Sequence, residues 1–144
     1  MYDIRQDRVV FLVKDDKNVV DAVGRSLTNR KPKWYRYGKS NRPFICGQGT
    51  TCFVVEDCFS CCSVFPFSVT GLAILGTNLL PSHLNILKQY KKVVIALDKD
   101  ATLKAVDLSR KISQYVNCSV AFLPDDLKNL KDEERERTIR KYIN

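Results

Sequence analysis

The sequence predicts an α/β protein, in which a small β-rich, basic lobe precedes a four-stranded parallel sheet with helices on both faces. Two observations lead to this fold class. From residue 51 onward, apolar runs alternate with stretches of helical period, as in strand–helix repeats. Before that point, two short apolar runs flank a polar turn, and a basic segment broken by prolines follows. We therefore expect two domains, residues 1–50 and residues 51–144.

The first domain begins with two predicted strands. Residues 8–13 (RVVFLV) and 19–24 (VVDAVG) are apolar runs joined by a polar turn, which is typical of a hairpin. Residues 24–43 then form a basic segment with aromatic residues among its charges. Such a mixture suits single-stranded nucleic acid, because cations attract phosphates and bases stack on rings. The predicted nucleic-acid-binding residues are Arg25, Arg30, Lys31, Lys33, Trp34, Tyr35, Arg36, Lys39 and Arg42. The alternative is that the rings only cover the core of the lobe while the lysines face water.

The second domain has four predicted strands, at residues 51–55, 71–76, 92–97 and 118–123. A short helix that Pro66 ends follows the first strand, and a helix from Pro81 to about Tyr90 follows the second. The third predicted helix has an apolar face, and Asp132 is expected to cap the last helix. The face of the third helix comprises Ala101, Ala105, Leu108, Ile112 and Tyr115.

The composition limits which binding partners and which cellular compartment we expect for the protein. The chain has 24 lysines and arginines against 16 aspartates and glutamates, a net charge of +8 that favours a polyanionic partner. It has no apolar stretch of membrane-spanning length and no signal-peptide pattern, so we expect a cytoplasmic protein with reduced cysteines and no membrane partner. Cys58 and Cys61 lack the further ligands of a zinc site and are expected in the core. His83 is expected on the surface.

Three acidic residues stand where predicted strands end. Glu56 follows the strand at 51–55, whereas Asp98 and Asp100 follow the strand at 92–97. The carboxyl ends of parallel strands meet at one edge of a sheet, and residues i and i+2 of an extended segment point the same way. Both aspartates could then face one cation, and such oxygen ligands suit Mg²⁺ or Mn²⁺. The sequence therefore predicts a divalent-metal site at this edge.

The order of these motifs resembles the TOPRIM domain, a Rossmann-like fold shared by primases, topoisomerases and certain nucleases. The matching segments are CFVVEDCFSCCSVF, GLAILGTNLLPSHLNILKQYKKVVIALDKDA and VAFLPDDLKNL. Within residues 24–43, a Gly-Arg-Ser turn before a basic stretch resembles phage-type replicative primases. The resemblance implies that Glu56 is a general acid/base or a metal ligand and that Asp98 and Asp100 are the metal-binding pair. Gly76 and Thr77 would form the turn after the second strand.

The chain departs from the TOPRIM pattern at three places. Asp57 stands where the family has glycine, Ser60 where it often has aspartate, and Ala101–Thr102 where a small pair is usual. The first and third departures would crowd the site, and the second would remove a ligand. A later acidic position of the family corresponds to Asp125 or Asp126.

The resemblance also implies a function. It is primer synthesis on a single-stranded DNA template from nucleoside triphosphates, a nucleotidyl transfer in DNA replication that uses Mg²⁺ or Mn²⁺. A helicase or a zinc-binding partner protein would supply template selection, and the setting would be a bacterial cell, with a bacteriophage as one source of the gene. A TOPRIM-type nuclease and a non-catalytic nucleic-acid-binding module remain alternatives. A topoisomerase is disfavoured, because it needs a further domain with a nucleophilic tyrosine.

Overall fold

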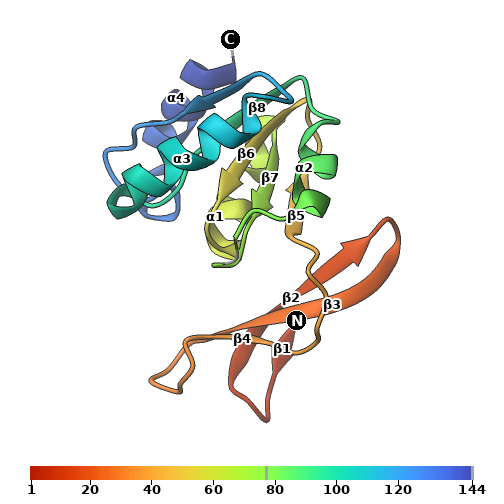
Figure 1. Ribbon diagram of the computed structural model, residues 1–144. Coiled ribbons are helices and arrows are strands. Elements are labelled where there is room, and N and C mark those ends of the chain that lie inside the picture. The colour runs from red at the N-terminus through yellow and green to blue at the C-terminus, as the bar shows by residue number, and fades with distance from the viewer. Residues whose placement is uncertain (77, 144) are drawn as a thin grey trace. The chain divides into compact units, whose positions relative to one another are not determined.

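The computed structural model describes residues 1–76 and 78–143, so the predicted turn residue Thr77 lies outside the described residues. The chain consists of two compact units, Met1–Phe44 and Ile45–Asn144 (Figure 1). The division falls within strand β5 (Phe44–Gly47), which belongs to the sheet of the second unit. The domain limit after residue 50 stays a prediction.

The first unit is an antiparallel sheet with the strand order β1-β2-β3-β4. Its strands are β1 (Tyr2–Asp3), β2 (Arg8–Asp15), β3 (Asn18–Ser26) and β4 (Trp34–Arg36). The predicted hairpin is confirmed as β2–β3. Two details of the prediction are wrong. Gly24 and Arg25 pair with both neighbouring strands and Ser26 pairs with β2, so these residues belong to β3 and form no turn. Trp34 and Tyr35 lie in β4 instead of a loop.

The second unit is built on a five-stranded sheet with the order β5-β7-β6-β8-β9. The four strands after β5 are β6 (Thr51–Val55), β7 (Thr70–Ala73), β8 (Lys92–Ile95) and β9 (Cys118–Val120). Each pairs in parallel with its neighbour, so the predicted parallel sheet is confirmed. β5 is an additional edge strand that the sequence did not reveal, because its four residues directly follow Pro43 and end at Gly47.

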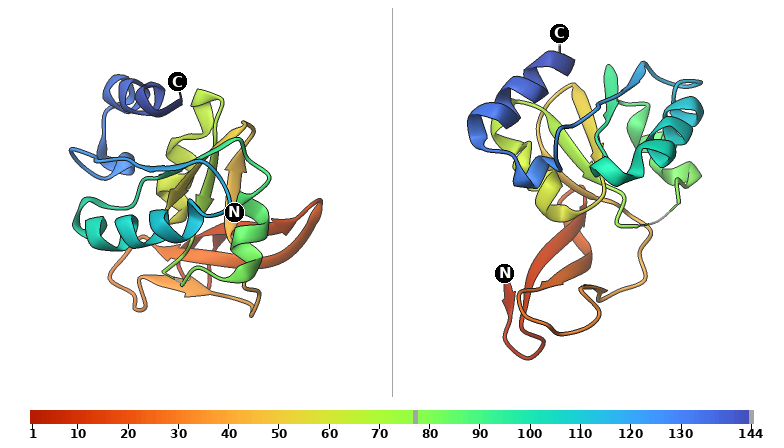
Figure 2. Two further views of the ribbon diagram at one scale, coloured as in Figure 1. Left: turned by 45° about the horizontal axis from the view of Figure 1, so that its top comes forward. Right: turned by 90° about the vertical axis from the view of Figure 1, so that its left-hand side faces the viewer.

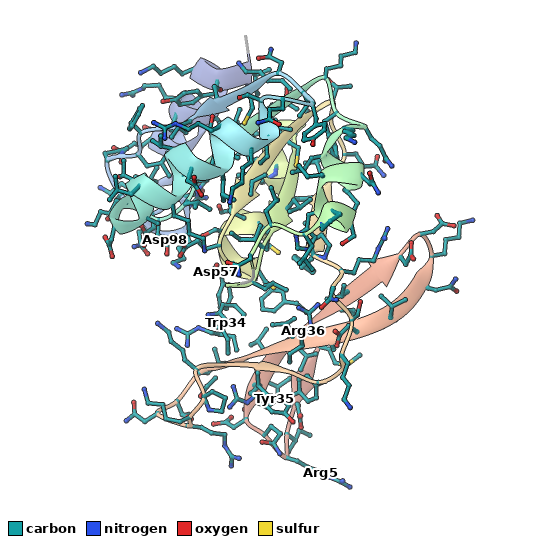
Figure 3. The ribbon with its side chains drawn as sticks, in the orientation of Figure 1. Arg5, Trp34, Tyr35, Arg36, Asp57 and Asp98 are labelled. Carbon is teal, nitrogen blue, oxygen red and sulfur yellow. The ribbon has the colours of Figure 1, made fainter. Side chains whose placement is uncertain are left out.

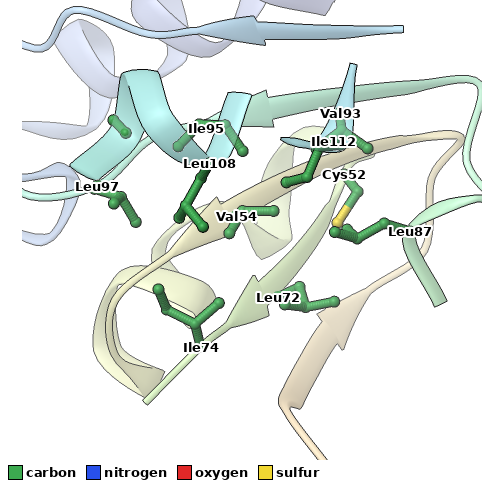
Figure 4. Packing of buried hydrophobic residues seen from close by; sticks show 11 residues of the cluster. Cys52, Val54, Leu72, Ile74, Leu87, Val93, Ile95, Leu97, Leu108 and Ile112 are labelled. Carbon is green, nitrogen blue, oxygen red and sulfur yellow. The ribbon is translucent and has the colours of Figure 1, made fainter. Parts of the chain in front are cut away.

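Helices cover both faces of this sheet, as predicted. They are α1 (Cys58–Ser63), α2 (Pro81–Leu87), α3 (Thr102–Ile112) and α4 (Asp132–Ile143), with 3₁₀ helices η1 (Phe65–Phe67), η2 (Lys99–Ala101) and η3 (Leu127–Asn129). Figures 1 and 2 show α2 and α3 on one face and α1 with α4 on the other. Cys52 and Val54 of β6 pack with Leu87 and Ile112 of the first pair (Figure 4). Because every residue of β6 is buried, this strand is the centre of the core.

Several helix details differ from the predictions. α1 ends at Ser63, and Pro66 lies within η1. α2 ends at Leu87, three residues before Tyr90. The side chain of Tyr115 lies beyond the end of α3 and is exposed, because the helical period that would bury it stops at Ile112.

Two polar residues at helix starts also differ. Asp132 is the first residue of α4 and not its cap, since the Lys131 carbonyl already accepts from the Arg135 N–H. His83 is buried, and its Nδ1 accepts from the Leu80 N–H at 3.2 Å in the first turn of α2. Across residues 1–76 and 78–143, none of the helices combines the length and the apolar composition that crossing a membrane requires.

Candidate active site and nucleic-acid interface

Glu56 and Asp98 meet at the carboxyl edge of the parallel sheet. Glu56 directly follows β6, and the ladder between β6 and β8 continues past β8, since the Ala96 N–H donates to the Val54 carbonyl at 2.8 Å. Two residues later the chain reaches Asp98, whose carboxyl group hydrogen bonds with that of Glu56. Two acidic side chains from separate strands are thus in direct contact, at the place where sites of open parallel sheets lie.

The surroundings of this pair disfavour two negative charges. Burial raises the pKa of Glu56, and the neighbouring Asp98 raises it further, against the opposing effect of Lys104 and Lys128. Burial also raises the pKa of Asp98, which Lys128 lowers and Asp126 raises. Two carboxyl groups in contact at a partly buried edge are well suited to a divalent cation, since its charge would let both ionise.

Asp100 is in a different position from Asp98. The backbone is extended at Asp98, with φ −55° and ψ 148°, but the 3₁₀ helix η2 starts at the next residue. The expected alternation of an extended segment is therefore wrong here, because the chain already turns toward α3. The side chain of Asp100 is exposed in η2. Its role as a metal ligand stays a prediction.

The donor set fits a partly hydrated ion. In the part of the chain that the structure describes, no three His, Cys, Asp or Glu side chains converge as a ready-made metal cluster. Glu56 and Asp98 together offer two carboxylates, which are hard oxygen ligands. Mg²⁺ is usually bound through one or two carboxylates and completes its shell with water and substrate phosphates. Two carboxylates in contact satisfy that requirement.

Lys128 is a site residue that the sequence analysis missed. Its Nζ donates to Asp57 Oδ2 at 2.6 Å and lies 3.6 Å from Asp98 Oδ2. Burial would lower the pKa of this ammonium, but the bond to Asp57 and the charges of the other carboxylates raise it overall. Asp57 and Asp98 are labelled in Figure 3. No sequence signal links Lys128 to Asp57, because 71 residues separate them.

Asp57, the departure from glycine, has a structural role instead of merely crowding the edge. It is the N-cap of α1, and its Oδ1 accepts from the Ser60 N–H at 2.9 Å while Oδ2 binds Lys128. A sequence signal for the cap was available, since an aspartate directly before a predicted helix is a typical N-cap. Ser60 is itself buried.

Asp125 and Asp126 hold the loop that carries Asp98. The Lys99 N–H donates to Asp126 Oδ1 at 3.0 Å, and the Lys99 ammonium lies 3.6 Å from Asp125 Oδ1. The Asp126 N–H and Asn129 lower the pKa of Asp125. These contacts tie the segment before η3 to the residue directly after Asp98.

The family model described as Toprim-like matches residues 53–133, which include both carboxylates of the pair. The chain belongs to the Toprim-like family. No curated protein matches this chain. The crystal structure of the Aquifex aeolicus primase, containing zinc-binding and RNA polymerase domains, is 26% identical to it, with a TM-score of 0.72 over 94% of this chain and 40% of that one.

Two further solved structures share the fold. A DNA primase domain from Pseudomonas aeruginosa has a TM-score of 0.74 at 21% identity over 95% of this chain and 50% of that one. A DnaG primase catalytic domain bound to single-stranded DNA has a TM-score of 0.70 at 19% identity over 94% of this chain and 51% of that one. This Toprim-like chain thus spans between two fifths and about half of the length of these primase structures.

In the first unit of the Toprim-like chain, Asp21 organises the predicted nucleic-acid-binding segment. Its Oδ1 accepts from the N–H groups of Ala22 and Gly38 at 2.7 and 2.8 Å. Its Oδ2 accepts from Arg36 Nε at 2.7 Å and from the Ser40 N–H at 3.1 Å. A Cβ at position 38 would lie 2.6 Å from Asp21 Oδ1, so this close approach needs glycine. Burial would raise the pKa of Asp21, but these donors lower it overall.

The predicted cations fall into two groups. Arg36 is bound to Asp21, and Arg42 lies 2.9 Å from Asp15 Oδ1, so both are ion-paired within the unit. Four of the others line a basic concavity of about 320 Å³. The remaining one, Lys39, is exposed outside the concavity. The lining consists of Arg25, Ser26, Leu27, Thr28, Asn29, Arg30, Lys31 and Lys33. Four cations and several hydroxyl and amide groups around one hollow suit a phosphate group.

The two predicted stacking residues differ in exposure. Trp34 is half-buried between the Arg25 guanidinium, 5.5 Å from the ring centroid, and the ring of Phe11 at 6.1 Å. Tyr35, labelled in Figure 3, is 43% exposed. Its ring stands edge-on to that of Tyr37, with ring centroids 5.0 Å apart. Trp34 therefore covers apolar surface, whereas Tyr35 offers an accessible ring.

Proposed function

We propose that this chain catalyses primase-like nucleotidyl transfer, in which it joins nucleoside triphosphates into a primer on single-stranded DNA. The observation that carries the proposal is the contact between Glu56 and Asp98 at the carboxyl edge of a Toprim-like sheet. The 26% identity to the Aquifex aeolicus primase over 94% of this chain supports it. A site of two touching carboxylates has the donors for Mg²⁺ or Mn²⁺ and for proton transfer.

In this reaction a primer 3′-hydroxyl attacks the α-phosphate of the incoming nucleotide, and pyrophosphate leaves. Glu56 would act as the general base that takes the proton from the attacking hydroxyl. Asp98 would hold the metal ion with Glu56, and Asp100 is proposed as a further ligand. When bound, the ion would neutralise the phosphate oxygens. Asp57 and Lys128 would fix the geometry of this edge.

The first unit would bind the template. Arg25, Arg30, Lys31 and Lys33 surround the basic concavity and would hold phosphates, with Lys39 as an additional contact. Tyr35 would stack on a base. The Aquifex aeolicus structure also contains a zinc-binding domain, and the present chain covers 40% of the whole chain in that structure. We therefore propose that a zinc-binding or helicase partner protein selects the template, in bacterial or phage DNA replication.

The deciding experiment is a primer-synthesis assay with labelled nucleoside triphosphates on single-stranded DNA, with Mg²⁺ or Mn²⁺. Wild type should form short products that depend on metal, and Glu56→Gln should form none while still binding the ion. Loss of full-length labelled DNA without nucleotide incorporation would instead indicate a nuclease. Template binding with neither reaction would leave a non-catalytic binding module.

A further inference from the structure

We propose that Lys128 is a positioning residue that couples metal loading of the Glu56–Asp98 pair to the arrival of a phosphate-bearing nucleotide. The identity of that nucleotide rests on the proposed function, whereas the competition between Lys128 and the metal does not. Two carboxylates hold the lysine at this edge in the structure, and the nucleotide would supply a third anionic partner.

The first step is that Lys128 already occupies the neighbourhood of the candidate metal ligands. One ammonium lies 2.6 Å from Asp57 Oδ2 and 3.6 Å from Asp98 Oδ2. Asp98 also contacts Glu56. A divalent ion that binds Asp98 would place its charge beside the ammonium, and two like charges at such a distance repel each other. Metal binding therefore requires Lys128 to withdraw from Asp98.

The second step is that the side chain can move while its backbone stays fixed. Lys128 lies in η3, between a buried leucine and the start of α4. The Leu127 side chain is 1% exposed, and its carbonyl accepts from Arg135 Nε at 2.8 Å, which anchors the turn. The side chain of Lys128 is itself 30% exposed. A lysine has a flexible stem of four carbons and three N–H donors, so the ammonium can turn from Asp98 to another anion.

The third step concerns what would draw the ammonium away. A phosphate group beside the carboxylate edge offers Lys128 a charge-assisted partner. Once the ammonium turns to the phosphate, Asp98 is left to the metal. By linkage, a phosphate-bearing ligand that favours metal binding is itself favoured by the metal to the same degree.

The test measures Mn²⁺ affinity by titration calorimetry on the whole chain, without nucleic acid. Without nucleotide, Lys128→Gln should bind Mn²⁺ about tenfold more tightly than wild type, a factor typical of coupled sites. Saturating adenosine monophosphate, which chelates Mn²⁺ only weakly, should tighten Mn²⁺ binding to wild type by a larger factor than to Lys128→Gln, in which only direct ligation of the ion by phosphate remains. Lys128→Arg should retain the wild-type coupling, because it keeps the mobile charge.

Lys99→Gln is the matched control, since it removes the same charge from a neighbouring lysine that pairs with Asp125. It should alter Mn²⁺ affinity much less than Lys128→Gln. Equal gains in both variants, a Lys128→Gln affinity no higher than wild type, or no binding by either protein would overturn the inference. The expected Mn²⁺ contrast without any primer synthesis would overturn the proposed function and leave this inference standing. A Mn²⁺-dependent rise in the thermal midpoint gives a second readout of the same affinities.

Discussion

Asp21 in the first unit and Asp98 in the second are both partly or fully buried aspartates next to a basic side chain, yet their surroundings act in opposite directions. Asp21 accepts from three backbone N–H groups and from Arg36, and its pKa is lowered. Asp98 contacts Glu56 and has its ammonium neighbour at a longer 3.6 Å, and its pKa is raised, chiefly by burial. Burial opposes ionisation of both aspartates, but the donors around Asp21 outweigh that effect and those around Asp98 do not.

This contrast separates structural acids from acids available for chemistry. A carboxylate whose lone pairs are all satisfied stabilises the fold and has nothing left for a ligand. Two carboxylates that face each other keep acceptor capacity, at a cost in stability that a bound cation can offset. The predictions below test that separation in both units, from the largest expected effect to the smallest.

The largest effect is expected from Asp21→Ala. It leaves the Arg36 charge and three N–H groups without their acceptor, and removing one partner of a buried ion pair costs about 3 kcal/mol. Urea unfolding followed by fluorescence would measure this loss in the first unit, because Trp34 is the single tryptophan of the chain. Asp15→Asn is the matched control, since it breaks only the exposed pair with Arg42 and should cost less than about 1 kcal/mol. Similar losses in both variants would contradict the structural role of Asp21.

At the second unit, Asp98→Asn should lower metal-dependent nucleotidyl transfer by about 100-fold or more, the usual cost of removing one charge-stabilising group. In metal-free buffer its thermal midpoint should equal or exceed that of wild type, because the substitution removes like-charge repulsion with Glu56. Asp107→Asn, whose carboxylate pairs with Lys111 on the exposed side of α3, is the control and should leave the rate unchanged. A clear fall in the midpoint of Asp98→Asn would mean that Asp98, like Asp21, is chiefly structural.

Much of this candidate site could be predicted from the sequence, because the ends of its strands can be recognised where apolar runs stop. The apolar runs that stop at Glu56 and near Asp98 fixed both residues to one edge of a parallel sheet. The orientation of Asp100 could not be predicted, since it depends on how soon the chain turns into η2. The role of Lys128 could not be predicted either, because its two carboxylate contacts form only when η3 packs against the carboxyl edge of the sheet.

The first unit was predicted less well for a similar reason. Its hairpin follows from apolar runs, but the roles of its cations depend on long-range contacts. Asp21 lies 15 residues before Arg36 and 17 before Gly38. Counting charges therefore could not separate the ion-paired Arg36 and Arg42 from the lysines around the concavity.

A smaller effect is expected in the pH dependence of the first unit. The pKa of Asp21 is lowered in the fold, so its contribution to stability is fully present above the unfolded value of about 3.9 and is lost as the pH falls through the lower folded value. The unfolding free energy reported by Trp34 should therefore decline in that acidic window. Asp21→Asn should flatten the decline, and an unchanged profile in the variant would assign the acid sensitivity to other carboxylates.

The smallest effect concerns the salt dependence of template binding, and it tests whether the two groups of cations differ. Lys31 and Lys33 line the concavity and Lys39 is exposed, whereas Arg42 is paired with Asp15. Each phosphate contact that is lost should reduce the slope of log K against log salt by about 0.7 for a single strand. Converting the three lysines to glutamine should then reduce the slope by about 2, and Arg42→Gln should leave it nearly unchanged. Fluorescence anisotropy of a labelled oligonucleotide over a salt series measures both slopes. If Arg42→Gln lowered the slope as much per charge as the lysine changes, the ion pair with Asp15 would not withhold that arginine from DNA, and only the net charge of the unit would matter.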